Sequence, residues 1–365
     1  MRDLRKQLNS RDLVWLTVFV LLVGGAAGVL LENLVLPYAS TWPGFSRLGV
    51  LSRQAPILIT KREEIRINEG VNQLEVSGRV KNGLLRIYTH EGDFASGRFR
   101  VIDSRSGVVV ASDGIVAVPA DGIAPVRPGV KFTAITAEGK ILAAKFLAFD
   151  RLTGLMFLEV QQNNLVVLRQ TESTKLQPGE KLLAVWSSEA RGSVSVRPLT
   201  MVFPSVENPG LAAVYEIGNL NAFLRTDWEP TGEALGGVVV DKDGQLAGFI
   251  TRIGADLRLL RSEDLKLVFE RFLSDGEFRW PSPKISYQVF SENQTELFGL
   301  PKKYGVLLKS SFGTLREDDF VYAVDGRELS PIESFQDSIL SRRIGQKIKL
   351  NLIRDGADKE LEISL

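Results

Sequence analysis

Few side chains in this 365-residue sequence can support nucleophilic or acid–base chemistry. There is one histidine, His90, and no cysteine, so a thiol nucleophile, a disulfide and a thiolate zinc site are excluded by composition. The common ways of activating a hydroxyl at neutral pH use an imidazole as the base, so they pass through His90 or are absent. We predict that His90 is an exposed residue in a turn and does not act as a base.

Two other arrangements remain open. Asp121 and Asp227 are candidates for a pair of catalytic carboxylates, although we favour turn or strand-end positions for both. A Ser/Lys dyad is compatible with the composition, but no Ser-x-x-Lys pattern stands at a plausible site. We therefore expect no catalytic residue, no metal site and no cofactor.

The elements around these residues are mostly β-strands. Short hydrophobic strands begin at about residue 72 and are separated by turn pairs such as Asp113-Gly114 and Asp243-Gly244. A first clear helix is expected from Ser262, which would cap it, to Gly276. Its apolar stripe consists of Leu265, Val268, Phe269 and Phe272. Two β-barrels closed by a helix are the plan of trypsin-like domains, and residues 75–275 are long enough for it.

Residues 224–251 resemble the segment that carries the nucleophile in HtrA/DegP-type serine proteases. Thr226-Asp227, Gly236-Gly237, the valine strand 238–240 and the turn Asp243-Gly244 follow the family pattern without a gap. The position of the family's serine holds Leu235. This leucine is interpreted as filling a lost active-site cleft, and the alternative is an apolar floor for a bound peptide.

The other two triad segments resemble the family in the same way. Residues 106–123 follow its histidine segment with Asp121 at the histidine position, and residues 150–159 follow its aspartate segment with Gly154 at the aspartate position. A triad needs a hydroxyl, an imidazole and a carboxylate, and its loss lowers turnover on the order of 10⁶-fold. Glu233 stands where the family has the glycine that shapes the oxyanion hole, and a carboxylate there disfavours an oxyanion.

The N-terminal part predicts a membrane anchor. Residues 1–12 are rich in basic side chains and residues 13–31 carry no charge, which is the length of a bilayer span. A cleaved signal peptide is the alternative, but residues 32–37 lack a small-x-small cleavage site. We expect a cytoplasmic segment over 1–12, a transmembrane helix over 13–36, a tether over 37–74 and all folded domains outside the cytoplasm.

After a proline-bearing linker at 276–283, residues 284–365 resemble the PDZ domain that follows HtrA proteases. The resemblance is carried by Leu300-Pro301, by residues 304–308 and 318–326, and by the closing residues 349–365. Ser330 to Glu333 has the pattern of a helix capping box. PDZ domains bind an extended C-terminus as an added strand. The residues expected to bind a peptide are Tyr287, Gln288, Val289, Phe290, Phe335 and Ile339. Gln288 replaces the glycine of the carboxylate-binding loop.

The resemblance predicts a membrane-anchored, catalytically inactive HtrA-like protein that binds peptides or unfolded envelope proteins, with a role in protein quality control. An active endopeptidase with a non-standard constellation is the alternative, and a homo-trimer is a further expectation from the family. The chain carries 45 basic and 44 acidic side chains, so its charge implies no general affinity for nucleic acid.

Overall fold

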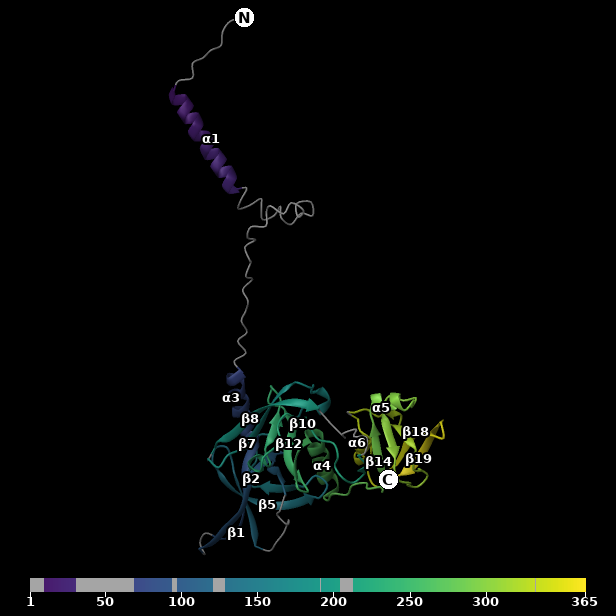
Figure 1. Cartoon of the computed structure of the whole chain (residues 1–365). Coiled ribbons are helices and arrows are strands. Elements are labelled where there is room, and N and C mark those ends of the chain that lie inside the picture. The colour runs from purple at the N-terminus through teal and green to yellow at the C-terminus, as the bar shows by residue number, and fades with distance from the viewer. Residues whose placement is uncertain are drawn as a thin grey trace. The chain divides into compact units, whose positions relative to one another are not determined.

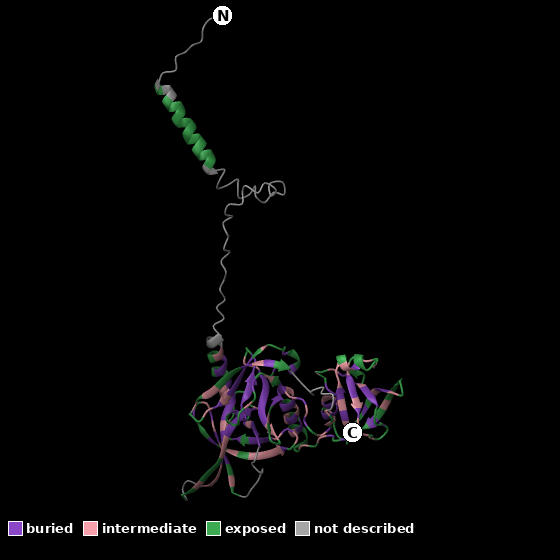
Figure 2. Cartoon of the chain, viewed as in Figure 1, coloured by how far each residue is buried: buried purple, intermediate pink, exposed green. Residues whose placement is uncertain are grey.

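The computed structural model describes residues 10–30, 69–93, 97–120, 129–190, 192–203, 213–331 and 333–365 (Figure 1). The chain divides into two units, Met1–Arg66 and Ile67–Leu365. In the first unit, α1 (Ser10–Leu30) is exposed over residues 14–28 (Figure 2). None of the described helices has the length and apolar character needed to cross a membrane. The expected span 13–36 also includes residues 31–36, and these lie outside the described residues, as do residues 1–9 and the expected tether up to residue 68.

The second unit begins with a helix where the sequence predicted a tether followed by strands. α3 (Glu69–Val80) forms because Val76 and Val80, four residues apart, bury their side chains against the barrels. The residues around them are mostly polar, so the sequence alone shows no clear apolar stripe for this helix. The prediction that strands start at about residue 72 is therefore wrong, because residues 69–80 form a helix.

The first barrel is a closed sheet of six strands in the order β1-β2-β3-β6-β5-β4. The strands are β1 (Leu84–Asp93), β2 (Arg98–Val109), β3 (Ile115–Pro119), β4 (Val130–Ile135), β5 (Ile141–Asp150) and β6 (Leu155–Val160). All neighbouring pairs are antiparallel, and the Asp113-Gly114 turn joins β2 to β3 as predicted.

The second sheet also has six strands, in the order β10-β8-β7-β11-β12-β13. They are β7 (Lys181–Ser187), β8 (Val194–Phe203), β10 (Arg225–Thr226), β11 (Val238–Val240), β12 (Leu246–Ile253) and β13 (Asp256–Arg261). A hydrogen bond of 3.0 Å from Leu224 N to Leu259 O links its two edges, so that the sheet curls into a second barrel. Short 3₁₀ turns lie at η2 (Lys81–Gly83), η4 (Ser173–Lys175) and η5 (Gly232–Ala234).

α4 (Ser262–Asp275) closes the barrels as predicted. Leu265 and Val268 are buried, and the helix ends at Gly276 with φ +70°. The N-cap is Arg261 and not Ser262, because the Ser262 hydroxyl donates to Thr171 O instead of capping the helix.

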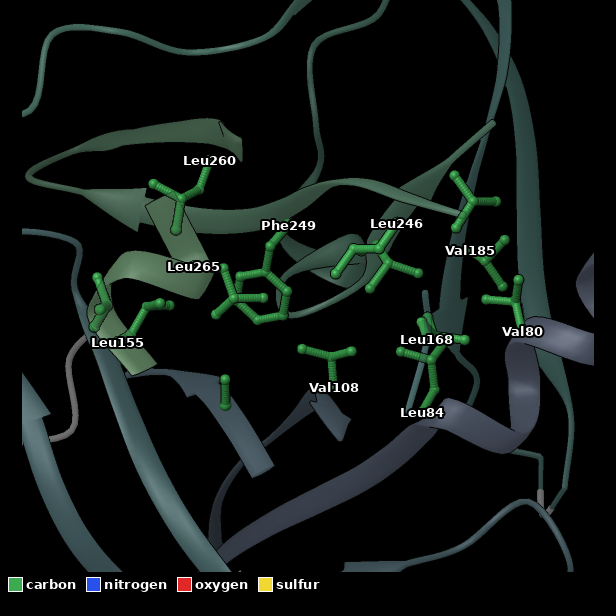
Figure 3. Close-up of a cluster of buried hydrophobic side chains, with 14 of the residues drawn as sticks. Val80, Leu84, Val108, Leu155, Leu168, Val185, Leu246, Phe249, Leu260 and Leu265 are labelled. Atoms are coloured by element: carbon green, nitrogen blue, oxygen red, sulfur yellow. The ribbon is translucent and has the colours of Figure 1, made fainter. Parts of the chain in front are cut away.

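The main hydrophobic core lies where the two barrels meet (Figure 3). Val108 of the first barrel faces Phe249 and Leu246 of the second, while Leu155 of the first barrel lies near Leu265 of α4. Separate clusters fill the inside of each barrel. The segments expected to carry the triad all border this central core.

The C-terminal sheet has the order β19-β18-β16-β15-β14-β9, with β17 paired to β16. Its elements are β14 (Ser286–Phe290), α5 (Glu292–Leu297), β15 (Gly305–Leu308), β16 (Phe320–Val324), β17 (Arg327–Glu328), α6 (Phe335–Leu340), β18 (Lys347–Arg354) and β19 (Ala357–Ser364). The edge strand β9 (Tyr215–Glu216) comes from the middle of the second barrel.

The predicted hairpin turns at Asp325-Gly326 and Asp355-Gly356 are confirmed, with positive φ at all four residues. The predicted start of the second helix is wrong. Ser334 caps α6 by accepting a hydrogen bond from Asp337 N. The earlier Ser330 hydroxyl accepts from Glu333 N within a separate turn.

Candidate active site

Leu235 lies at the end of a short 3₁₀ turn that enters β11. Its carbonyl accepts a hydrogen bond from Ser106 N at 3.1 Å, and its N–H donates to Gly232 O. Its side chain is buried, with 5% exposed. Gly236 follows with φ +81°, and a Cβ there would lie 1.9 Å from Ser106 O. The chain therefore makes a sharp turn next to β2, and the side chain at this turn is a buried leucine.

Gly154 occupies the last position of the loop between β5 and β6. The buried Asp150 carboxylate organises this loop by accepting hydrogen bonds from Thr153 and from Trp280 Nε1 at 2.7 Å. Gly154 has φ +69°, a left-handed conformation that side chains disfavour. A Cβ at this position would lie 2.6 Å from Arg252 O of β12. A side chain at this position would therefore require the backbone of β12 to shift.

Asp121 lies outside the described residues, so its side chain is not placed. Its neighbour Ala120 is buried and donates its N–H to Gly154 O at 2.8 Å. Pro119 Cδ lies 3.1 Å from where a Cβ on Gly236 would be. The fold thus brings Ala120, Gly154 and Gly236 into one region, although they lie far apart in the sequence.

A buried cation borders this region. Arg105 is 5% exposed, donates to Pro119 O at 2.7 Å and forms an ion pair with Asp103. Sequence reasoning did not select Arg105, because nothing in its spacing distinguishes it from a strand arginine. Glu233, in the turn before Leu235, is exposed.

Of the two candidate paired carboxylates, Asp227 is described by the structure and Asp121 lies outside the described residues. Asp227 is exposed and accepts a hydrogen bond from Thr200 N at 2.7 Å, and this backbone donor lowers the pKa of Asp227 below its ordinary value. Its local role is to join β10 to β8. Within the described residues, no group of three or more histidine, aspartate or glutamate side chains is placed to hold a metal ion.

His90 lies inside β1 and not in a turn, so that prediction is wrong. It is paired with Val101 on one side and Lys131 on the other, at a β-bulge. Its Nε2 is 2.9 Å from Thr133 Oγ1, and its ring packs on Phe99. Burial, with the nearby charge of Lys131, lowers the pKa of His90 below its ordinary value. The ring is held within the first barrel's own sheet.

The six residues expected to bind a peptide lie on β14 and α6. Tyr287, Val289, Phe335 and Ile339 are fully buried within the C-terminal core, whereas Gln288 and Phe290 are half-buried. The Tyr287 and Phe335 rings pack edge to face at 5.3 Å. Residues 287–290 form a strand and not the expected carboxylate-binding loop, because alternate side chains point into the core.

Comparison with known proteins agrees with this architecture. Residues 105–249 match the trypsin-like peptidase domain. A probable periplasmic DegP-like serine endoprotease of Chlamydia muridarum is 23% identical over 274 residues, covering 71% of this chain and 53% of that protein. The periplasmic pH-dependent serine endoprotease DegQ of Escherichia coli is 22% identical over 243 residues, covering 62% and 52%. The chain therefore spans about half the length of the curated relatives it matches.

Solved structures show the same fold. The HtrA-type protease AlgW with a tripeptide superposes with a TM-score of 0.59 at 18% identity, covering 80% of this chain and 96% of that one. AlgW with a decapeptide gives 0.55 at 17% identity, covering 80% and 97%. The chain is thus similar to HtrA/DegP-type trypsin-like serine proteases, in agreement with the three sequence segments.

Proposed function

We propose that this chain is a catalytically inactive HtrA-like protein that binds extended peptides or unfolded proteins through a C-terminal PDZ domain. The observation that carries the proposal is the backbone at Gly154, which has positive φ and lies too close to Arg252 O for a side chain. Together with Leu235 at the serine position, it leaves a retained scaffold without the groups that hydrolysis needs.

Peptide binding is supported by the topology of residues 284–365 and by the relatives. β14 lies near one edge of an antiparallel sheet and α6 packs beside it through Phe335, which is the arrangement that PDZ domains use for strand addition. AlgW has been solved with bound peptides. We take peptides of unfolded envelope proteins as the ligand class, since several relatives are named as periplasmic.

Anchoring through residues 13–36 stays a prediction. Its support is the uncharged run 13–31 with a basic flank on its N-terminal side. The boundaries 37–74 for a tether, 75–275 for the protease-like domain, 276–283 for a linker and 284–365 for the PDZ domain belong to the same proposal, as does a homo-trimer.

Activity assays on the full chain test the proposal. We expect no cleavage of casein and no labelling by a fluorophosphonate probe. Leu235→Ser alone should restore neither, because a serine there still lacks an activated base and a carboxylate at position 154. Proteolysis by the unmodified chain that is lost in His90→Ala would establish the active endopeptidase instead.

A further inference from the structure

A short strand from the second barrel completes the C-terminal sheet. β9, which lies between β8 and β10 in the sequence, pairs antiparallel with β14, with Tyr215 opposite Tyr287 and Glu216 opposite Ser286. The Ile217 N–H extends this pairing by donating to Ile285 O at 3.1 Å. The chain then continues to β10. The edge of β14 is therefore covered by the protein's own backbone.

Helix α6 also forms hydrogen bonds to the backbone of the segment 215–221. Gln336 of α6 is fully buried, and its amide makes two hydrogen bonds to the segment. Its Nε2 donates to Asn219 O at 2.8 Å, and its Oε1 accepts from Asn221 N at 3.0 Å. A buried amide that donates to one peptide group and accepts from another recognises main chain and not a particular side chain. Residues 215–221 therefore bridge β14 and α6.

The side chains of the segment fill the apolar surface between these elements. Ile217 is 4% exposed and belongs to the same cluster as Ile285, Tyr287 and Phe335. The Tyr215 ring lies 5.9 Å from that of Tyr287. This cluster contains four of the residues predicted to bind a peptide.

The direction of the segment is informative. It runs antiparallel to β14, and its aliphatic residue Ile217 lies beside Ile285, just before β14 begins. Gly218 follows with φ +109°, and a Cβ there would meet Ser282 Oγ at 2.7 Å. A glycine at this point lets the chain turn away from β14 directly after the aliphatic residue.

We propose that residues 213–222 are an internal ligand of the C-terminal domain, so that an external peptide binds β14 only by displacing them. The competing partner is an extended peptide that ends in an aliphatic residue. This inference rests on the peptide-binding function proposed above and describes how that site is regulated.

A release variant tests the occupancy. The probe is a fluorescent peptide with the sequence of residues 214–217, Val-Tyr-Glu-Ile, and a free C-terminus. In the full chain, Ile217→Asp places a charge in an apolar cluster and should release the segment, so the probe should bind at least about tenfold more tightly than to the wild type. Val214→Asp adds the same charge in the same segment at a side chain that is 54% exposed, and it should bind the probe as the wild type does.

A locked variant gives the opposite test. Because the sequence has no cysteine, Glu216→Cys combined with Ser286→Cys introduces a unique pair at directly opposed positions of an antiparallel ladder. The oxidised form should bind no probe, and reduction should restore wild-type binding. Failure of this disulfide to form in the folded chain would overturn the internal pairing.

The outcomes separate the two proposals. If the wild type, Ile217→Asp and the oxidised double variant bind the probe equally, peptide binding survives and the internal-ligand inference is wrong. If the disulfide forms but neither Ile217→Asp nor the reduced double variant binds the probe, the peptide-binding function is wrong, and the internal-ligand inference falls with it, leaving only a structural strand.

Discussion

Placing an aspartate at position 154 should destabilise the protein strongly. Gly154 has φ +69°, and a Cβ there would lie 2.6 Å from Arg252 O, a backbone atom that cannot rotate away. The left-handed conformation costs a non-glycine residue about 1–2 kcal/mol. Shifting β12 to relieve the contact resembles overpacking of a core, which costs about 1–3 kcal/mol. We therefore expect Gly154→Asp to lower the free energy of unfolding by about 2–5 kcal/mol.

Gly254, in the turn between β12 and β13 of the second barrel, provides a matched control. It has φ +63°, but no atom lies within 4 Å of the place where a Cβ would stand, so Gly254→Asp should cost only the conformational part. Urea unfolding followed by tryptophan fluorescence measures both variants. With an m-value of about 2–3 kcal/mol/M, Gly154→Asp should lower the midpoint by about 1–2 M and Gly254→Asp by about half that or less.

Equal midpoints for the two variants would refute this reasoning, since the contact with Arg252 O would then carry no energy. Gly154→Ala distinguishes shape from charge, because it has the same Cβ contact without a carboxylate and should lose nearly as much stability as Gly154→Asp. The result bears on function. If position 154 rejects a carboxylate, restoring the three proposed triad positions at once should not rebuild a protease unless β12 moves.

Three further predictions concern other parts of the chain. Asp264→Ala should lower the free energy of unfolding by about 3–5 kcal/mol, because it removes one partner of a buried charge. Burial alone would lower the pKa of Arg261, but the carboxylates of Asp264 and Asp337 raise it well above the ordinary value. Asp256→Ala, which breaks an exposed pair with Arg258, should cost less than about 1 kcal/mol in the same urea titration. Because the folded-state pKa of His90 is lowered, stability should fall as pH drops below the ordinary value of 6.5, and His90→Gln should flatten that dependence; an unchanged pH profile would contradict it. A reporter fused after Pro37 should lie outside the cytoplasm, and a mature protein beginning near residue 40 would instead show a cleaved signal.

Local patterns in the sequence predicted several strands and hairpin turns in both folded parts. Turn pairs such as Asp113-Gly114 and Asp355-Gly356 lie where the structure joins strands, because residues that tolerate positive φ mark tight hairpins wherever they occur. The apolar stripe of α4 is confirmed for the same reason, since a period of 3.6 residues needs no tertiary contact to be visible.

The tertiary structure decided what these patterns could not show. α3 was missed because its buried face is only Val76 and Val80, and these become a core face only against the barrels. His90 was assigned to a turn, but ladder partners on both sides hold it in β1. The residue types at positions 154 and 235 are read directly from the sequence. The close approach of Arg252 O to Gly154 could not be predicted, because Arg252 lies almost a hundred residues away in the chain.

The internal strand illustrates the limit most clearly. β9 has only two residues, too few for any alternation of apolar and polar side chains to be visible. Its pairing depends on β14, about seventy residues later, and on the Gln336 amide beyond it. The sequence by itself therefore determined the residue types at positions 121, 154 and 235 and where several hairpin turns lie. Only the fold determined that one barrel segment fills the neighbouring sheet edge, because such a contact is specified by distant backbone groups and not by local residue types.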